Sequence, residues 1–533
     1  MNNKRILIFS LLFILALASF FRLWRLDSVP PGLYPDVAIN GNDALDSLQT
    51  GNFKLFYPEN NGREGVFMWL IAFSFTLFGP SVFAIKIVPA FFGILTVLGT
   101  YLLVKELFSN LKKKNENLNP EIIALISSFF LAISFWHVNF SRLGFRAILV
   151  PFSLVFAFYF LFLGFRKKKT YNFVLSGLFF AFGFYSYISY RFVVFMMAVA
   201  LVSWWIYYKR QRLQKEFLRF AACCLLSTFI FALPIGIYFL KHPQDFFGRA
   251  AGVSIFSGGN ILYKVGKSIV LHLGMFNFFG DANWRHNFAG SPQLLWPIGI
   301  FFLVGIILSL KWFVSAIRKK DIPECAVYGL LFSWFFFMLL SGILSYEGIP
   351  HALRVIGVIP VVYIFSGIGA YLCFYYLKKI YKTKKQTIAF GVVISIFLFS
   401  VAYAQFEKYF NQWGESQEVK DSFSENYVKV GEYLNSIPPG VKTYLIVNQD
   451  GVPVLWPNGI PMPAQTPMFI ERTKFGQPRA IYLKPSDLDQ ISIEGKTIIL
   501  PLQHDEKLLL EIEEKFPFGI FKEENGLIIY QAL

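Results

Sequence analysis

The sequence has few charged residues for its length, and this shortage narrows the class of protein. Only 16% of its 533 residues are charged and 55% are apolar, whereas a typical soluble protein carries about 25% charged residues. A soluble enzyme of this length cannot bury so much apolar surface, so lipid must surround a large part of the chain. The same composition excludes a disordered chain, a collagen and a coiled coil.

Cysteine is also scarce, and no cysteine pattern indicates a disulfide framework or a zinc site. All four cysteines lie in apolar runs, and residues 405–533 contain none. No CxxC or Cys/His spacing typical of zinc ligands occurs. The cysteines are Cys223, Cys224, Cys325 and Cys373.

Acidic side chains are missing from the centres of the apolar runs. The fifteen Asp and Glu residues within positions 1–404 lie in loops or at the ends of these runs. Proton- and ion-coupled pumps usually bury an Asp or Glu in the bilayer. The distribution therefore argues against such a pump and directs attention to the loops.

The net charge of +17 is unevenly distributed. Residues 405–533 hold 12 basic and 18 acidic residues, while residues 1–404 hold 38 basic and 15 acidic residues. The positive charge belongs to the apolar part, where it marks one face of a membrane rather than a nucleic-acid surface. We expect no nucleic-acid partner.

Eleven apolar runs are long enough to cross the hydrocarbon core of a bilayer. A further run, residues 65–78, has only 14 residues before Gly79-Pro80, which predicts an interfacial or re-entrant helix. The eleven predicted spans are residues 6–24, 82–104, 121–138, 147–165, 171–187, 191–208, 220–240, 294–317, 325–345, 355–377 and 386–404.

The basic clusters set the expected orientation. With eleven spans and a cytoplasmic amino terminus, every dense cluster falls on the cytoplasmic side, as the positive-inside rule requires. Loops 25–64 and 241–293 and the tail 405–533 are then extracytoplasmic, in a multi-pass protein of the plasma (inner) membrane. The clusters are residues 112–114, 166–169, 209–219, 318–320 and 378–385.

The tail, residues 405–533, alternates strand and helix signals. An amphipathic stretch at 422–434 precedes a strand at 441–447, and a second strand is predicted at 497–502. A helix at 504–515 and a closing strand at 526–530 complete the pattern. We predict a small α/β domain.

The first external loop contains the most specific motif of the chain. Residues 30–41 read PPGLYPDVAING, in which prolines fix the backbone around Asp36. One interpretation is that Asp36 caps the next helix. The other is that the rigid loop holds its carboxylate for chemistry at the membrane surface.

Further motifs follow in order along the chain. They are Tyr-Pro-Asp at 34–36, Arg-Glu-Gly-Val-Phe at 63–67, Leu-Phe-Gly-Pro-Ser at 77–81, Lys-Ile-Val-Pro at 86–89, Ser-Arg at 141–142, Tyr-Ser-Tyr to Arg at 185–191, and Pro-His-Ala-Leu-Arg at 350–354. This series resembles the C-type (GT-C) membrane glycosyltransferases. Among them it is most similar to the family 39 group, which includes protein O-mannosyltransferases and lipid A aminoarabinose transferases. The resemblance covers most of residues 1–404, and the tail shares only a general likeness to the extracytoplasmic domains of such enzymes.

The resemblance implies an all-α polytopic membrane domain of about eleven transmembrane helices in residues 1–404, followed by an extracytoplasmic α/β domain in 405–533. It also implies a hexosyl- or pentosyltransferase that moves a sugar from a polyprenyl-phosphate carrier to a glycan, lipid or protein acceptor at the outer face. The family precedent is a single displacement with inversion. The partners would be the lipid-linked donor, the acceptor and membrane lipid, and no cofactor is expected.

The residue types at the motif positions suit this chemistry. Asp36 matches the family position of a base that takes the proton of the acceptor hydroxyl. Basic side chains at headgroup depth can bind the lipid phosphate and stabilise the charge growing on it; these are Arg63, Lys86, Arg142, Arg191 and Arg354. Further substrate contacts are expected from Tyr34, Glu64, Tyr187 and His351. Snorkelling charges and an aromatic belt explain the cations and tyrosines equally well.

The sequence departs from the family pattern at two positions. Val37 follows Asp36 where relatives commonly have Glu, and Leu143 follows Arg142 where many have an acidic residue. A second carboxylate is therefore unsupported, and so is a divalent metal that would need two. His137 lies nearby, but a single histidine at the end of a span is more often a hydrogen-bonded interfacial residue.

Two other functions fit the same sequence features. A flippase or transporter of a lipid-linked sugar would share a basic outer cleft but would need no base. A catalytically inactive assembly subunit would explain the missing second acid, because a fold alone does not establish activity.

Overall fold

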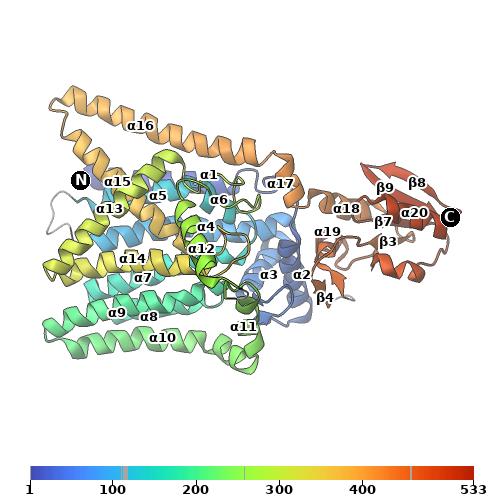
Figure 1. Cartoon of the computed structure of the whole chain (residues 1–533), viewed down its shortest axis with the longest axis horizontal. Helices are drawn as coiled ribbons and strands as arrows, with labels where there is room; N and C mark the ends of the chain where they lie inside the picture. Colours follow the sequence, from blue (N-terminus) through green and yellow to red (C-terminus); the bar gives the residue numbers. More distant parts are fainter. Residues whose placement is uncertain (1, 110, 112–117, 257–258, 456–458, 533) are drawn as a thin grey trace. The chain divides into compact units, whose positions relative to one another are not determined.

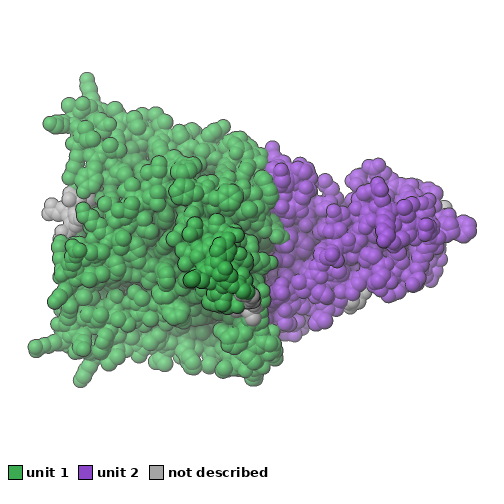
Figure 2. Space-filling model, in the orientation of Figure 1, with its two compact units in different colours: residues 1–24, 89–413 green, residues 25–88, 414–533 purple. Residues whose placement is uncertain are grey.

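The computed structural model describes all residues except 1, 110, 112–117, 257–258, 456–458 and 533. The predicted basic cluster at 112–114 lies outside the described residues. By their contacts the residues form two compact units, coloured separately in Figure 2. Unit 1 comprises Met1–Trp24 and Pro89–Trp413, and unit 2 comprises Arg25–Val88 and Gly414–Leu533.

Unit 1 is helical. Its α-helices are α1 (Asn2–Leu23), α4 (Val82–Ser109, which begins in unit 2), α5 (Pro120–Ile133), α6 (Phe135–Phe140), α7 (Leu149–Lys167), α8 (Thr170–Gly183), α9 (Val193–Arg210), α10 (Gln214–Lys241), α11 (Pro243–Gly252), α12 (Ile261–Gly274), α13 (Trp296–Arg318), α14 (Ile322–Ile343), α15 (Ile359–Lys378) and α16 (Lys384–Phe406). Short 3-10 helices η1 (Arg146–Ile148), η2 (Ile188–Phe192) and η3 (Ile356–Val358) precede α7, α9 and α15, and the π-helix η4 (Glu407–Trp413) follows α16.

Within the described residues, nine helices are long and apolar enough to cross a membrane. They match nine of the eleven predicted spans and run over Lys4–Leu23, Val82–Ser109, Arg146–Lys167, Ile188–Arg210, Gln214–Lys241, Trp296–Arg318, Ile322–Ile343, Ile356–Lys378 and Lys384–Trp413. The other two predicted spans contain only the 14-residue helices α5 and α8. Ser134 ends α5 and caps α6, and the chain turns after Gly183, so neither apolar run is one continuous helix.

Close helix packing gives unit 1 its core. α8 packs between α7 and α10, and α15 packs against α5 and α13 (Figure 1). Gly305 of α13 and Gly369 of α15 let these two helices approach, because a Cβ on Gly305 would lie 1.8 Å from the Phe365 carbonyl oxygen. In the apolar 18-residue stretch that marks α15 as a possible span, 94% of the residues are buried. In the corresponding stretch of α16 only 6% are buried. Most apolar side chains of α16 are therefore exposed or partly exposed, as expected of a helix surrounded by lipid.

Unit 2 contains a five-stranded mixed sheet in the order β6-β3-β7-β9-β8. β3 pairs in parallel with β6 and β7, and β9 pairs antiparallel with β7 and β8. The strands are β3 (Lys442–Ile446), β6 (Ile481–Leu483), β7 (Thr497–Pro501), β8 (Ile520–Glu524) and β9 (Leu527–Ala532). The helices of the tail are α17 (Gln417–Ser422), α18 (Glu425–Ser436), α19 (Gln465–Phe475) and α20 (Glu506–Lys515), with η5 (Met462–Ala464), η6 (Pro485–Gln490) and the short strands β4 (Pro453–Val454) and β5 (Ile460–Pro461).

The strand alternation sorts the tail core onto two faces of the sheet. Leu445 and Leu500 pack with Val430 of α18 and Met468 of α19 in one cluster. Tyr444, Ile446 and Ile499 pack with Leu508 and Ile512 of α20 in the other. This is the period-two pattern of a sheet with helices on both faces. The predicted fold class, a helical membrane domain with a small α/β domain in the tail, is confirmed.

Residues 25–88, treated in the sequence analysis as part of the 1–404 domain, group by contact with residues 414–533. They form α2 (Pro35–Thr50), the two-residue strands β1 (Phe56–Tyr57) and β2 (Arg63–Glu64), and α3 (Val66–Phe78), before α4 begins. α2 packs against α3 and α19, and most of its residues are buried. The segment predicted to be the first external loop is thus an ordered, largely helical element. The 13-residue α3 has the short length predicted for an interfacial helix.

Candidate active site

Asp36 lies in the first turn of α2. Tyr34 is the N-cap residue and Pro35 the first helical residue, and the Tyr34 carbonyl accepts hydrogen bonds from the amides of Val37 and Ala38 at 2.8 and 3.0 Å. Asp36 is therefore not the capping residue, and the start of α2 has no side-chain cap. The carboxylate is partly exposed, and no hydrogen bond or ion pair joins it to another described residue.

The segment that leads to Asp36 is held at two points. The Lys86 Nζ donates to the Pro30 carbonyl oxygen at 2.9 Å, and Lys86 is only 2% exposed. The Thr466 hydroxyl, at the start of α19, donates to the Leu33 carbonyl oxygen at 2.8 Å. These contacts fix the backbone immediately before the helix. Lys86, predicted to bind phosphate, thus has a structural contact in unit 2.

The body of α2 is joined to α19 by polar contacts. The Asn42 side-chain amide donates to the carbonyl and the side-chain oxygen of Gln465, at 3.1 and 2.9 Å. Arg472 donates to the Asn42 carbonyl at 3.2 Å and to the Asp46 carboxylate at 2.5 Å. Two elements far apart in the sequence therefore set the orientation of the helix that carries Asp36.

Arg63 and Glu64 are buried in β2. The Arg63 guanidinium contacts the Asp43 carboxylate at 2.6 Å and donates to the Asn40 side-chain oxygen at 2.9 Å. Burial raises the pKa of Asp43 from its ordinary 3.8 to about 6, against the opposing effect of Arg63. Arg63 is 1% and Glu64 4% exposed. The family-like Arg-Glu pair thus lies inside unit 2, and Arg63 contacts α2 one and two helical turns after Asp36.

Arg142 is fully buried in unit 1. It donates to the carbonyl oxygens of Phe21 and Trp24 at 3.0 and 2.8 Å, and its guanidinium lies over the rings of Tyr409 and Phe410. Such contacts stabilise a buried guanidinium within the protein.

Arg191 and Tyr187 lie near η2. The Arg191 guanidinium stacks on the Phe246 ring, 3.8 Å from its centre, and donates to the Phe246 carbonyl at 2.7 Å. Tyr187 is buried beneath the Arg146 guanidinium, 5.4 Å from its ring centre. Arg191 is only partly buried, so this cation lies nearer the surface than Arg142.

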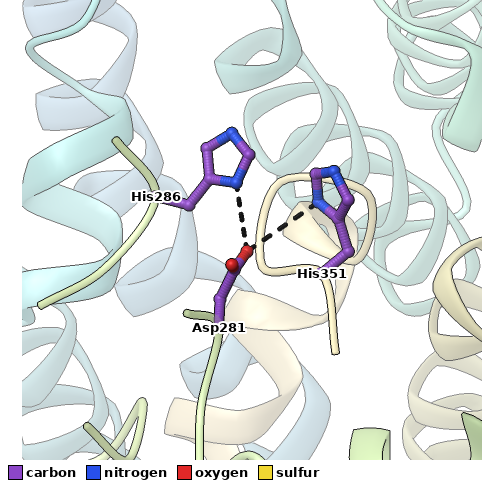
Figure 3. Close-up of side chains that lie close together, drawn as sticks. All are labelled: Asp281, His286 and His351. Carbon is purple, nitrogen blue, oxygen red and sulfur yellow. Dashed lines mark hydrogen bonds and ion pairs between the residues drawn. The ribbon is translucent and has the colours of Figure 1, made fainter. Parts of the chain in front are cut away.

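Arg354 and His351 lie between α14 and η3. The Arg354 guanidinium pairs with the Glu347 carboxylate at 2.9 Å, and Glu347 is 73% exposed. The His351 Nδ1 lies 3.9 Å from the Asp281 carboxylate, which also accepts a hydrogen bond from the His286 Nδ1 at 3.1 Å (Figure 3). Two segments of unit 1 therefore meet at three titratable side chains.

Asp281, His286 and His272 were assigned no role from the sequence. The only signal in the sequence was an Asp and a His five residues apart in a loop predicted to be external, and their approach to His351 depends on the fold. His272 of α12 accepts a hydrogen bond from the His351 amide at 3.3 Å through its Nε2, while its Nδ1 lies 2.8 Å from the Ser268 carbonyl oxygen. Burial lowers the pKa of His272 to about 4, so its ring is neutral near pH 7.

The site residues predicted from the sequence thus fall into separate groups in the two units. Unit 2 holds Tyr34, Asp36, Arg63, Glu64 and Lys86 around α2. Unit 1 holds His351 beside Arg354, whereas Arg142 and Arg191 have separate surroundings.

The chain is similar to known proteins in sequence and in fold. Residues 65–238 match the family model of the dolichyl-phosphate-mannose-protein mannosyltransferases. ArnT from Cupriavidus metallidurans, solved bound to undecaprenyl phosphate, aligns over 100% of this chain and 98% of its own with a TM-score of 0.55 and 11% identity. The apo structure of the same protein gives a TM-score of 0.57 at 10% identity, covering 100% of this chain and 99% of that one.

The archaeal oligosaccharyltransferase AglB from Archaeoglobus fulgidus, solved with an inhibitory peptide and a dolichol-phosphate, aligns over 99% of this chain and 74% of its own, with a TM-score of 0.54 and 12% identity. The chain has the fold of the C-type membrane glycosyltransferases. The resemblance seen in the motifs is therefore confirmed for the fold over the whole chain and, in sequence, for residues 65–238. No curated protein matches the chain by sequence.

Proposed function

We propose that this multi-pass membrane protein transfers a sugar from a polyprenyl-phosphate donor to a glycan, lipid or protein acceptor, with Asp36 as the general base. The observation that carries the proposal is the Asp36 carboxylate, which is partly exposed on a rigidly held helix start and joined to no other described residue. The C-type fold and the mannosyltransferase model match support the reaction class. Two similar structures were solved with undecaprenyl phosphate and with a dolichol-phosphate, which supports the carrier class.

The proposed reaction is a single displacement. The acceptor oxygen forms a bond to the anomeric carbon as its proton passes to the Asp36 carboxylate. The bond from that carbon to the lipid phosphate breaks, and its electron pair stays on the phosphate oxygen. The products are the glycoside with inverted configuration and the polyprenyl phosphate, and Asp36 then releases its proton to water.

The surroundings of the basic residues divide their proposed roles. The Arg354 side chain is 14% exposed, but its partner, the Glu347 carboxylate, is 73% exposed, so another anion can replace this partner at little cost. We assign Arg354 and the partly exposed Arg191 to the lipid phosphate. Arg63, Lys86 and Arg142 contact buried protein groups, so we assign them to holding the site in shape. Tyr34, Glu64 and Tyr187 remain proposed sugar or backbone contacts.

A groove in unit 1 supports a lipid substrate. It encloses about 1490 Å³ and is lined by largely apolar residues of α1, α5, α15 and α16. We propose that the polyprenyl chain lies in it. Ala402 lines the groove, so Ala402→Trp should narrow it and weaken binding of undecaprenyl phosphate, while unaltered binding would remove the groove from the account.

We place the protein in the plasma membrane with a cytoplasmic amino terminus and an extracytoplasmic tail. The function is tested by mass spectrometry of envelope glycans, lipids and proteins from cells with and without the gene. One glycosidic modification should disappear and return with the wild-type gene but not with Asp36→Asn. Loss of lipid-linked sugar transport without loss of a glycosidic product would favour the transporter, and restoration by Asp36→Asn would favour an inactive subunit.

A further inference from the structure

Asp281, His286 and His351 bring three metal-binding side chains together in unit 1. Asp281 and His286 lie between α12 and α13, and His351 lies between α14 and η3. One ligand atom from each lies within 4.8 Å of the other two. In Figure 3 both imidazoles direct their Nδ1 atoms toward the same carboxylate oxygen. We propose that these residues bind a zinc ion.

The type and spacing of the donor atoms favour zinc. Two imidazole nitrogens and one carboxylate oxygen suit Zn²⁺, whereas Ca²⁺ and Mg²⁺ prefer oxygen ligands alone. Ligands of a tetrahedral zinc ion lie about 2.0–2.2 Å from the metal, and hence roughly 3.3–3.5 Å from each other. The Asp281 oxygen lies 3.1 Å from the His286 Nδ1 and 3.9 Å from the His351 Nδ1. The three ligand atoms lie within 4.8 Å of one another, so side-chain rotations that draw the ligand atoms together would complete the site.

The cluster is buried. The side chains of Asp281, His286 and His351 are 4%, 8% and 14% exposed. Asp281 places a buried carboxylate in the cluster, and the nearby Arg354 guanidinium pairs with Glu347. A divalent cation would neutralise a buried carboxylate, which is costly to leave without a partner charge.

Hydrogen bonds orient the proposed ligands. The Asp281 oxygens accept the amides of Asn283 and Ala352, both at 2.8 Å. His272 accepts the amide of His351 at 3.3 Å. Outer contacts of this kind fix ligand orientation at metal sites. The Arg354 amide, 3.4 Å from the His351 Nδ1, makes a long hydrogen bond that metal coordination would replace.

The proposed site would have two properties. It would link the α12–α13 segment to the α14–η3 segment, because its ligands come from both. Three protein ligands would also leave a fourth position for water or another oxygen ligand. From the sequence no metal was expected and His351 was assigned a substrate contact, so the geometry of the cluster departs from both expectations.

Zinc retention by the full-length protein tests the proposal. Protein purified in detergent without a histidine tag is treated with EDTA, incubated with a small excess of zinc chloride and desalted, and its zinc content is measured by mass spectrometry. The wild type should retain one zinc per chain and should melt at a higher temperature with zinc than with EDTA. Asp281→Ala, His286→Ala and His351→Ala should each retain zinc at least about 10-fold more weakly. His242→Ala and His504→Ala are matched controls that should bind like the wild type.

Melting in EDTA shows whether each variant is folded before its zinc content is compared. X-ray absorption at the zinc edge of the wild type identifies the ligands even if a variant does not fold, and it should show two imidazoles. A wild type that retains no zinc, folded His286→Ala and His351→Ala variants that retain it fully, or a spectrum without imidazole would overturn the proposal. Because no donor or acceptor is used, this outcome is separate from the test of sugar transfer.

Discussion

Arg472 of α19 forms an ion pair with Asp46 of α2, with 2.5 Å between its Nη2 and the Asp46 Oδ1, although 426 residues separate the two in sequence. Arg472 is fully buried at its side chain, while the Asp46 side chain is 47% exposed. Arg472 also donates to the Asn42 carbonyl. The tail of the chain therefore helps to hold the helix that begins at Asp36.

Removal of Arg472 should destabilise unit 2. In Arg472→Ala the buried Asn42 carbonyl loses a charged donor, which should lower the free energy of unfolding by about 1–3 kcal/mol. Asp46→Ala should cost less, because its side chain is half exposed and water can replace its partner. Thermal unfolding of both variants in detergent measures the difference. Equal losses, or a larger loss for Asp46→Ala, would contradict the assignment of Arg472 as the buried support.

The raised pKa of Asp43 predicts a pH dependence of stability. Because burial raises this pKa from 3.8 to about 6, folded protein binds the proton more tightly than unfolded chain. The stabilising contribution of this group is therefore complete below about pH 4 and declines as the pH rises through about 6. Asp43→Asn does not titrate, so the difference in melting temperature between wild type and variant should change across this interval. A difference in melting temperature between the wild type and Asp43→Asn that stays constant from pH 4 to pH 7 would refute the raised pKa of Asp43.

The membrane topology depends on the 14-residue helix α8. If α8 crosses the membrane, an odd number of crossings separates Lys169 from Ala404, and these positions lie on opposite sides. We expect a crossing, since α8 packs between α7 and α10, both long enough to span. A reporter fused after Ala404 should be active outside, and one fused after Lys169 should be inactive there. Activity of both fusions on one side would show that α8 does not cross.

Arg354 and Arg142 should respond differently to removal. Arg354→Ala should lower the melting temperature less than Arg142→Ala does, because its ion-pair partner Glu347 is exposed, and it should weaken binding of undecaprenyl phosphate roughly tenfold, because a charge-assisted contact is lost. Arg142→Ala should lower the melting temperature, since a buried guanidinium joined to two carbonyls and two rings is removed. Titration with undecaprenyl phosphate and thermal unfolding compare the two. Unchanged affinity in Arg354→Ala would remove it from the phosphate site.

Local patterns in the sequence predicted most of the fold. Apolar runs located the long helices, because a bilayer demands continuous apolar segments. Alternating apolar residues located β3, β7 and β9, and amphipathic spacing located α20. The breaks at Ser134 and after Gly183 were missed, since no proline or charge interrupts those runs.

The candidate site was less predictable. The motif around Asp36 identified the residue, but α2 was interpreted as a loop because its apolar residues pack against α3 and α19 rather than forming a long run. The approach of Asp281 and His286 to His351 could not be predicted either, because the two segments are separated in the sequence by two helices, α13 and α14. Contacts between distant segments leave no periodic signal in either one.

The role of Asp36 is tested most directly by the turnover of purified, folded Asp36→Asn. Asp27→Asn is the matched control, because Asp27 is an exposed carboxylate only nine residues earlier in the chain. With the donor and acceptor identified by mass spectrometry, product formation per folded molecule is measured beside melting temperature and undecaprenyl phosphate binding. The account predicts that Asp36→Asn loses about 10²–10⁴-fold in turnover, while its folding and lipid binding, and all properties of Asp27→Asn, stay close to wild type. Near-normal turnover in well-folded Asp36→Asn would contradict it.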